Sequence, residues 1–166
     1  MSHPKRAARS PSKSKSDPKA KRSISRYTTT ISAKRTVAEI TQMLAQAHAS
    51  DVWTEFDDGR PVAISFRKKT ARGIILAFRL PARTAGVHKI LLNSKGIPAR
   101  LRTKEQAERV GWRILRDLVQ AQLALVEAEM VQLEEVVLPY AQDKEGRTVF
   151  ERMTQEQFPG LLLADN

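Results

Sequence analysis

The chain contains no cysteine, which excludes disulfides, thiolate metal sites and cysteine nucleophiles. It also lacks a long apolar run, because every hydrophobic stretch is interrupted by charge. The sequence therefore predicts neither a membrane span nor a secretory segment. From these absences we expect a cytoplasmic protein that has no membrane partner.

Acidic residues are scarce in two segments, although the whole chain has a formal charge of only +11. Residues 1–35 contain eleven Lys or Arg and one acid, and residues 60–116 contain fifteen Lys or Arg and two glutamates. Residues 36–59 contain five acids without Lys or Arg, and residues 117–166 contain ten acids and three bases. A basic middle flanked by acidic segments indicates a polyanionic partner such as DNA or RNA.

Residues 1–26 have almost no large apolar side chain and are built from Lys, Arg, Ser, Ala and Pro. Such a composition cannot form a core, so we expect a disordered basic tail followed by a single domain at 27–166. The tail resembles those of chromatin and nucleoid proteins in composition, which implies phosphate neutralisation with counterion release. A solubilising linker and an organelle transit peptide are the alternatives.

Hydrophobic periodicity predicts an α+β fold that begins with a helix at 36–49, whose start can reach back to Ser32. Thr36 and Glu39 have the spacing of a capping box. The preceding residues 27–31 are β-prone and either form an edge strand or lead into this helix.

From Asp51 the period changes to two, which predicts strands at 52–57, 62–67 and 74–80 in an antiparallel meander. Asp58 and Gly59 supply the first turn. One face of this sheet is apolar and requires helices to cover it. The opposite face is expected to carry Trp53, Ser65, Arg67, Ala77 and Arg79.

A short helix around 87–92 and a long helix at 103–130 complete the predicted order αβββαα. In the long helix, Thr103 and Gln106 have capping-box spacing, and Glu105–Arg109 and Arg113–Asp117 are four residues apart. A further short helix is expected at 148–155, and the apolar residues 158–163 either dock on the domain or bind a partner. The long helix should bury one apolar stripe, made of Ala107, Gly111, Ile114, Leu115, Leu118, Ala121, Leu125 and Val126.

Groups that could carry out catalysis are few. There is no Gly-rich phosphate loop, no His pair at metal spacing and no Gly-x-Ser-x-Gly motif. The acidic pairs at 57–58 and 134–135 are typical of a turn and of a helix surface. We therefore expect a non-enzymatic protein with no catalytic residue, metal or cofactor.

The candidate nucleic-acid contacts come from the basic middle of the chain, which also contains Arg83, Lys89 and Lys95. Cations at the start of the long helix oppose its dipole unless an anion lies nearby, or unless Glu105 and Glu108 screen them. Trp53 either stacks on a base or packs under the end of the long helix. The candidates are Arg67, Lys68, Lys69 and Arg72 of the hairpin, Arg79 and Trp53 of the sheet, and Arg100, Arg102 and Lys104 of the helix start.

Two resemblances accompany these patterns. The order of helix, three antiparallel strands and helix resembles the double-stranded RNA-binding domain, with Arg102-Thr103-Lys104 where that family presents lysines to phosphates. The run Asp-Gly-Arg-Pro-Val-Ala-Ile-Ser-Phe, the helix from Gln-Ala-Glu-Arg-Val-Gly-Trp, and Leu-Pro-Tyr followed by Gly-Arg-Thr-Val resemble an uncharacterised family of phage and prokaryotic genomes. That resemblance implies a small αβββα domain of prokaryotic or viral origin and says nothing about an activity.

Together these features predict a phage or prokaryotic protein that binds DNA or RNA largely without sequence preference, through its basic tail and basic hairpin. The alternative is an interaction or assembly protein. In that case the acidic last third of one copy meets the basic middle of another, and the long helix mediates homo-oligomerisation.

Overall fold

The structure, a computed structural model, describes residues 24–70 and 72–156. The expected tail up to residue 23 and the apolar run at 158–163 lie outside these residues. The α+β prediction is confirmed, with one antiparallel sheet in the order β1-β2-β3. The elements are α1 (Ala33–Gln46), β1 (Asp51–Asp57), β2 (Arg60–Lys69), β3 (Ile75–Pro81), α2 (Thr84–Asn93), α3 (Lys104–Glu127), α4 (Leu133–Val137) and α5 (Val149–Glu156), with 3-10 turns at Ala99–Leu101 and Leu138–Tyr140.

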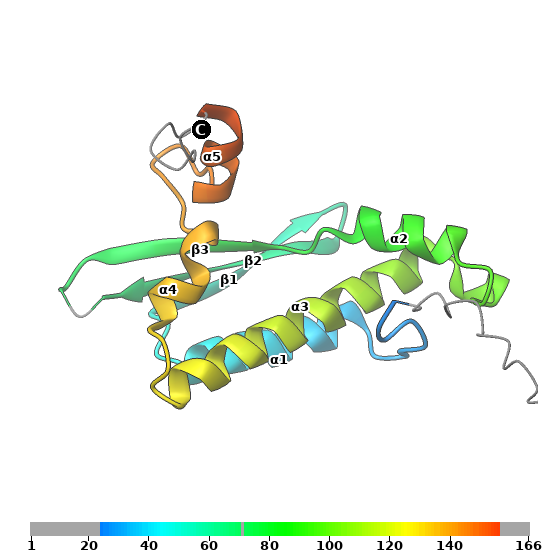
Figure 1. The fold of residues 1–166 in the computed structure, drawn as a ribbon, viewed down its shortest axis with the longest axis horizontal. Helices are drawn as coiled ribbons and strands as arrows, with labels where there is room; N and C mark the ends of the chain where they lie inside the picture. The colour runs from blue at the N-terminus through cyan, green and yellow to red at the C-terminus, as the bar shows by residue number, and fades with distance from the viewer. Residues whose placement is uncertain (1–23, 71, 157–166) are drawn as a thin grey trace, which may run out of the picture.

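Helices α1 and α3 lie side by side beneath the sheet, and α5 lies on the opposite side (Figure 1). The apolar face of the strands is buried against α1 and α3. Phe66 and Phe78 are directly paired across β2 and β3, and their rings stack with centroids 5.0 Å apart. The remaining fully buried large side chains of this core are Ile40, Leu44, Ile64, Leu80 and Trp112.

The strand register confirms the predicted faces of the sheet. Trp53 lies opposite Ser65, which lies opposite Arg79 on β3, so these three side chains share the face away from α1 and α3. The alternation predicts an inward position for Phe56, and this is wrong. The register shifts between Glu55 and Phe56, and the Phe56 side chain is 60% exposed. A bulge at this point turns the side chain out of the core.

Helix α3 begins as predicted, with the Thr103 hydroxyl accepting a hydrogen bond from the backbone N–H of Gln106. The second half of the expected capping box is not formed. The buried Gln106 amide instead donates to the carbonyl oxygens of Tyr27 and Thr29, at 2.8 and 2.9 Å. Residues 27–31 are therefore a coil anchored on the first turn of α3 rather than an edge strand.

The apolar stripe predicted for α3 is partly wrong. Ala107 and Leu115 are buried, but Ile114, Leu118 and Leu125 are exposed. The side of α3 that faces the sheet carries Leu115 together with Trp112 and Val119, which the predicted stripe did not include. The helix is apolar on two adjacent sides, and the sheet covers only one of them.

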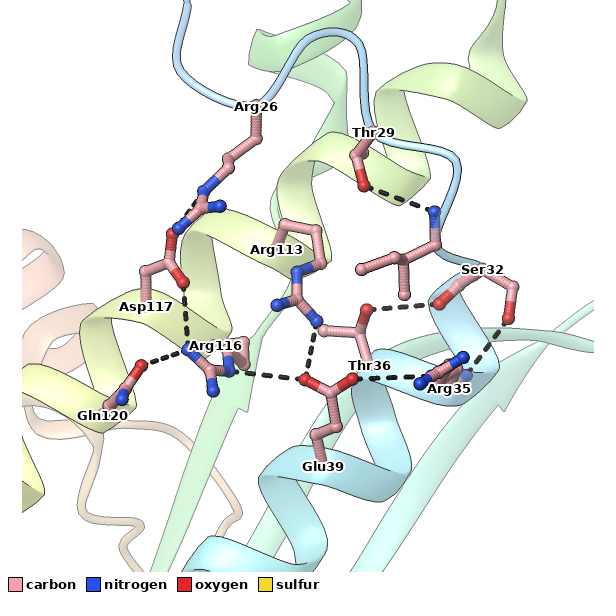
Figure 2. Close-up of polar contacts among 11 residues, drawn as sticks. Arg26, Thr29, Ser32, Arg35, Thr36, Glu39, Arg113, Arg116, Asp117 and Gln120 are labelled. Carbon is pink, nitrogen blue, oxygen red and sulfur yellow. Dashed lines mark hydrogen bonds and ion pairs between the residues drawn. The ribbon is translucent and has the colours of Figure 1, made fainter.

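Glu39 links α1 to α3, and Figure 2 shows it between three arginines. Helix α1 begins at the N-cap Ser32, so Thr36 and Glu39 do not form the expected capping box. The Glu39 carboxylate accepts from the buried Arg113 at 2.6 Å and lies 3.4 Å from Arg116 and 3.8 Å from Arg35. The network binds the two helices together.

The ion pair expected between Arg113 and Asp117 is not formed, because Arg113 points to Glu39. Asp117 instead accepts from Arg26 at 2.9 Å and pairs with Arg116 at 3.3 Å (Figure 2). The other expected pair on α3, between Glu105 and Arg109, is present. Long-range packing therefore overrides local spacing at one of the two sites.

Replacing Glu39 with Gln should lower the free energy of unfolding by about 2 kcal/mol, since the buried Arg113 then loses its charged partner. Urea unfolding followed by circular dichroism measures the change. Glu105→Gln is the matched control, because this exposed i,i+4 partner of Arg109 should contribute at most about 0.5 kcal/mol. Equal losses in the two variants would contradict the structural role of Glu39.

The chain after α4 crosses the edge of β3 and leads to the opposite side of the sheet. Ala141 forms an isolated antiparallel bridge with Phe78, and the Gln142 N–H donates to the Ala77 carbonyl oxygen at 2.8 Å. This contact covers part of the edge strand. Helix α5 follows, where the Arg83 guanidinium lies 5.4 Å from the centre of the Phe150 ring.

The start of α5 is a capping box whose carboxylate is held ionised. The Thr148 N–H donates to Glu151 at 2.9 Å, and this hydrogen bond, with the Thr148 hydroxyl and the charges of Arg79 and Arg83, lowers the pKa of Glu151 despite partial desolvation. Because the folded-state pKa is lowered, the stabilisation is complete above the usual glutamate pKa of 4.5 and is lost as the pH falls through the folded-state value.

We therefore expect α5 to loosen under acid conditions before the rest of the domain. Hydrogen exchange at the α5 amides, measured from neutral pH downwards and corrected for intrinsic rates, should show reduced protection below about pH 4.5. In Glu151→Gln the acid-dependent part of this loss should disappear. If Glu151→Gln and the natural chain show the same pH profile, groups other than Glu151 cause the loss of protection.

Candidate nucleic-acid interface

Ion pairing divides the cations of the basic middle into neutralised and free groups. Of the fifteen Lys and Arg at 60–116, those with a carboxylate partner among the described residues are all arginines: Arg60, Arg67, Arg79, Arg109, Arg113 and Arg116. Positive charge is thus largely compensated across the sheet and between α1 and α3.

The sheet face that carries Trp53 is an internal polar network. Arg79 donates to Glu55 at 2.9 Å, and Glu55 also accepts from the Ser65 hydroxyl at 2.6 Å. The Arg67 guanidinium lies 5.5 Å from the centre of the Trp53 ring. Trp53 is on the face away from α3, so it does not pack under the end of that helix. Glu55 is two residues after Trp53, so the alternation of the strand already places both on the same face. The sequence could therefore have indicated this partner of Arg79.

The hairpin between β2 and β3 presents fewer free charges than expected. Lys69 and Arg72 are exposed and pair with no carboxylate of the described residues. Lys68 instead donates its ammonium to the Ala47 carbonyl oxygen at the end of α1, at 3.0 Å. Next to the tip, Ile74 and Ile75 are also exposed.

A second group of free cations lies where α2 leads into α3. Lys89, Lys95, Arg100 and Lys104, together called the basic end, are exposed and have no carboxylate partner within 24–70 and 72–156. The sequence places all four in the basic middle, but only the fold brings Lys89 and Lys95 to the start of α3. Thr103 caps this helix start.

Arg102 supports the basic end rather than adding a free charge to it. Its guanidinium donates to the carbonyl oxygens of Ile97 and Ser94, at 2.9 and 3.2 Å. His88 contacts the Arg102 carbonyl oxygen at 3.2 Å through Nε2. These bonds fix the connection between α2 and α3, which is the backbone that carries Lys95 and Arg100.

The basic N-terminal segment enters the described structure at this same end. Ile24 and Tyr27 pack against a small core of Leu91, Ile97 and Ala107, which joins α2 to α3. The preceding residues 1–23 contain eight Lys or Arg and one Asp in sequence. The basic end and the attachment point of the tail are therefore adjacent.

The hairpin tip and the basic end lie at opposite ends of the molecule (Figure 1). Helix α3, with 24 residues, runs about 36 Å between these regions. The nine candidates from the sequence thus do not form one surface. Lys69 and Arg72 lie at the tip, and Lys68 is bound to the end of α1. Arg67, Arg79 and Trp53 lie on the sheet face, and Arg100, Arg102 and Lys104 lie at the other end.

Two features of the described residues bear on other functions. No three His, Asp or Glu side chains there lie close enough together to hold a metal ion. None of the helices in this part of the chain combines the length and the apolar character that crossing a bilayer requires.

Comparison of the chain with protein-family models, with curated proteins and with solved structures finds no match. The two resemblances drawn from the sequence therefore stay predictions.

Proposed function

We propose that this protein is a non-enzymatic nucleic-acid-binding module that contacts phosphates with the basic end and the tail together. The observation that carries the proposal is the position of four cations that pair with no carboxylate of the described residues, beside the point where the tail joins the fold. These cations are Lys89, Lys95, Arg100 and Lys104. Elsewhere in the basic middle, carboxylates already neutralise six arginines.

Binding of this kind gains free energy mainly by releasing counterions from phosphates. Three of the four groups are lysines, whose flexible ammonium groups act as point charges and not as bidentate readers of base edges. The positive charge of Lys104 at the first turn of α3 becomes favourable when a phosphate lies close to the helix N-terminus. These properties favour binding to the backbone of DNA or RNA without strong sequence preference.

The hairpin provides a second, smaller contact. Lys69 and Arg72 could reach a phosphate, and the exposed Ile74 and Ile75 could contact bases or sugars. Because the hairpin and the basic end lie at opposite ends of the molecule, one polymer that touches both must extend along the domain. A short oligonucleotide should therefore need only the basic end and the tail.

Fluorescence anisotropy with labelled single- and double-stranded DNA and RNA of unrelated sequences tests the proposal. We expect the full chain to bind, with similar affinity for different sequences of one strand type and with log K falling linearly as log[salt] rises. Absence of binding at about 50 mM salt, or an affinity that does not respond to salt, would rule the proposal out.

A further inference from the structure

Helix α3 has an exposed apolar stripe that no described element covers. Ile114, Leu118 and Leu125 are 36%, 40% and 38% exposed, and Ala121 between them is exposed as well. At 100° per residue these four positions lie within about 60° of one another around the helix. The stripe is therefore one narrow ridge and not a set of scattered apolar residues.

The same side of α3 is already used for helix packing in its first half. There α2 lies against it (Figure 1), with Leu91 packed on Ala107 and a methyl group of Thr84 close to Gly111. A Cβ placed on Gly111 would lie 2.9 Å from this methyl group, so the two helices approach closely. Beyond Gly111 the side continues as the stripe, and α2 no longer covers it.

We propose that the stripe binds a second copy of this chain, with the two α3 helices antiparallel. The spacing of the stripe is self-complementary about a two-fold axis between residues 119 and 120. Ile114 then faces the Leu125 position of the second copy, and Leu118 faces Ala121, so each large side chain meets an apolar partner. The larger Leu118 packs on the smaller Ala121, as interdigitating helices require.

Charge decides the orientation. Among the described residues, the exposed Lys104 at the start of α3 has no carboxylate partner, and the exposed Glu127 and Glu129 at and just past its end have no cationic partner. An antiparallel pair sets the basic start of each helix toward the acidic end of the other. A parallel pair would place the two acidic ends together, which is unfavourable. The sequence indicates assembly through the long helix as an alternative function. The antiparallel pair assigns that assembly a surface, a partner and a register.

The proposal is independent of nucleic-acid binding. In the antiparallel pair the two basic ends lie at opposite ends of the dimer, and three of their four cations, Lys89, Lys95 and Arg100, come from outside α3. A test without nucleic acid therefore leaves the proposed function unaffected.

The first test is the molar mass of the full chain, freed of nucleic acid, by sedimentation equilibrium over a range of concentrations. We expect a reversible dimer, and we expect Leu118→Glu to weaken dimerisation at least tenfold. Leu92→Glu is the matched control, since Leu92 is an exposed leucine on α2 outside the stripe and its replacement should leave the dimer intact. Circular dichroism checks that both variants are folded. A natural chain that is monomeric at every concentration, or a Leu118→Glu variant with the dimerisation of the control, would overturn the proposal.

The second test determines the register of the two α3 helices by cysteine crosslinking. It is simple because the chain has no cysteine of its own. Ala121→Cys should crosslink to itself with a short bismaleimide, because the two positions lie next to the axis. Ile114→Cys and Leu125→Cys should each fail alone, since the equivalent positions are about 16 Å apart along the helix pair, but an equal mixture of the two should crosslink. Self-crosslinking of both single variants would show a parallel pair and contradict the proposed register.

Discussion

Neutralising the basic end should weaken nucleic-acid binding by about 100-fold at 0.15 M salt. In this variant, Gln replaces all four cations of the basic end. The fold should be unaffected, because these side chains are exposed and make no ion pair with the described residues. Each phosphate contact contributes about 0.9 to the salt slope for double-stranded DNA and about 0.7 for a single strand. The slope of log K against log[salt] should therefore fall by about 3 to 4 for a duplex.

A comparison of single substitutions shows whether position or total charge matters. Arg100→Gln should weaken binding about fivefold at 0.15 M salt. Lys144→Gln also removes one exposed charge, but from the turn before α5 and away from the basic end, so its effect should be smaller. Equal effects of the two substitutions would mean that only the net charge of the chain matters and that the basic end is not a binding surface.

Replacing Trp112 with Ala should lower the free energy of unfolding by about 3 to 5 kcal/mol. Trp112 is fully buried on the side of α3 that faces the sheet, and its indole N–H donates to the Pro61 carbonyl oxygen at 3.2 Å. The substitution creates a cavity and leaves a buried carbonyl group without its donor. Urea unfolding monitored by circular dichroism measures the loss without relying on tryptophan fluorescence.

Trp53→Ala is the matched control, because the second tryptophan lies on the other face of the sheet and is partly exposed beside Arg67. Its loss should amount to about 1 kcal/mol. A similar stability for Trp112→Ala and Trp53→Ala would be inconsistent with α3 as the main cover of the sheet.

Local patterns predicted the elements well. The alternation from Asp51 to Leu80 placed three strands, and Thr103 marked the start of α3, because strand period and N-capping depend on neighbours in sequence. Where two explanations fit one pattern, the sequence could not choose between them. Gln106 had the spacing of a capping box, yet its amide is bound to carbonyl groups about eighty residues away.

The candidate site depended even more on long-range contacts. The sequence located the basic middle but not the carboxylates that neutralise it, since Glu39 and Arg113 are 74 residues apart. Likewise, both apolar sides of α3 have helical spacing, and only the position of α2 and the sheet decides which is buried. The sequence therefore places Lys69 and Lys104 in one basic segment, although the fold separates them.

The central claim is that the folded domain, and not only its tail, binds nucleic acid. The most direct measurement is the salt dependence of binding for a chain that begins at Ile24, which retains the described residues and lacks the first 23. We predict measurable binding at about 50 mM salt with a slope near −3 to −4 for duplex DNA, lost in the variant without the four cations of the basic end. If the shortened chain is folded by circular dichroism and yet does not bind, or binds equally well without those four cations, the claim is contradicted.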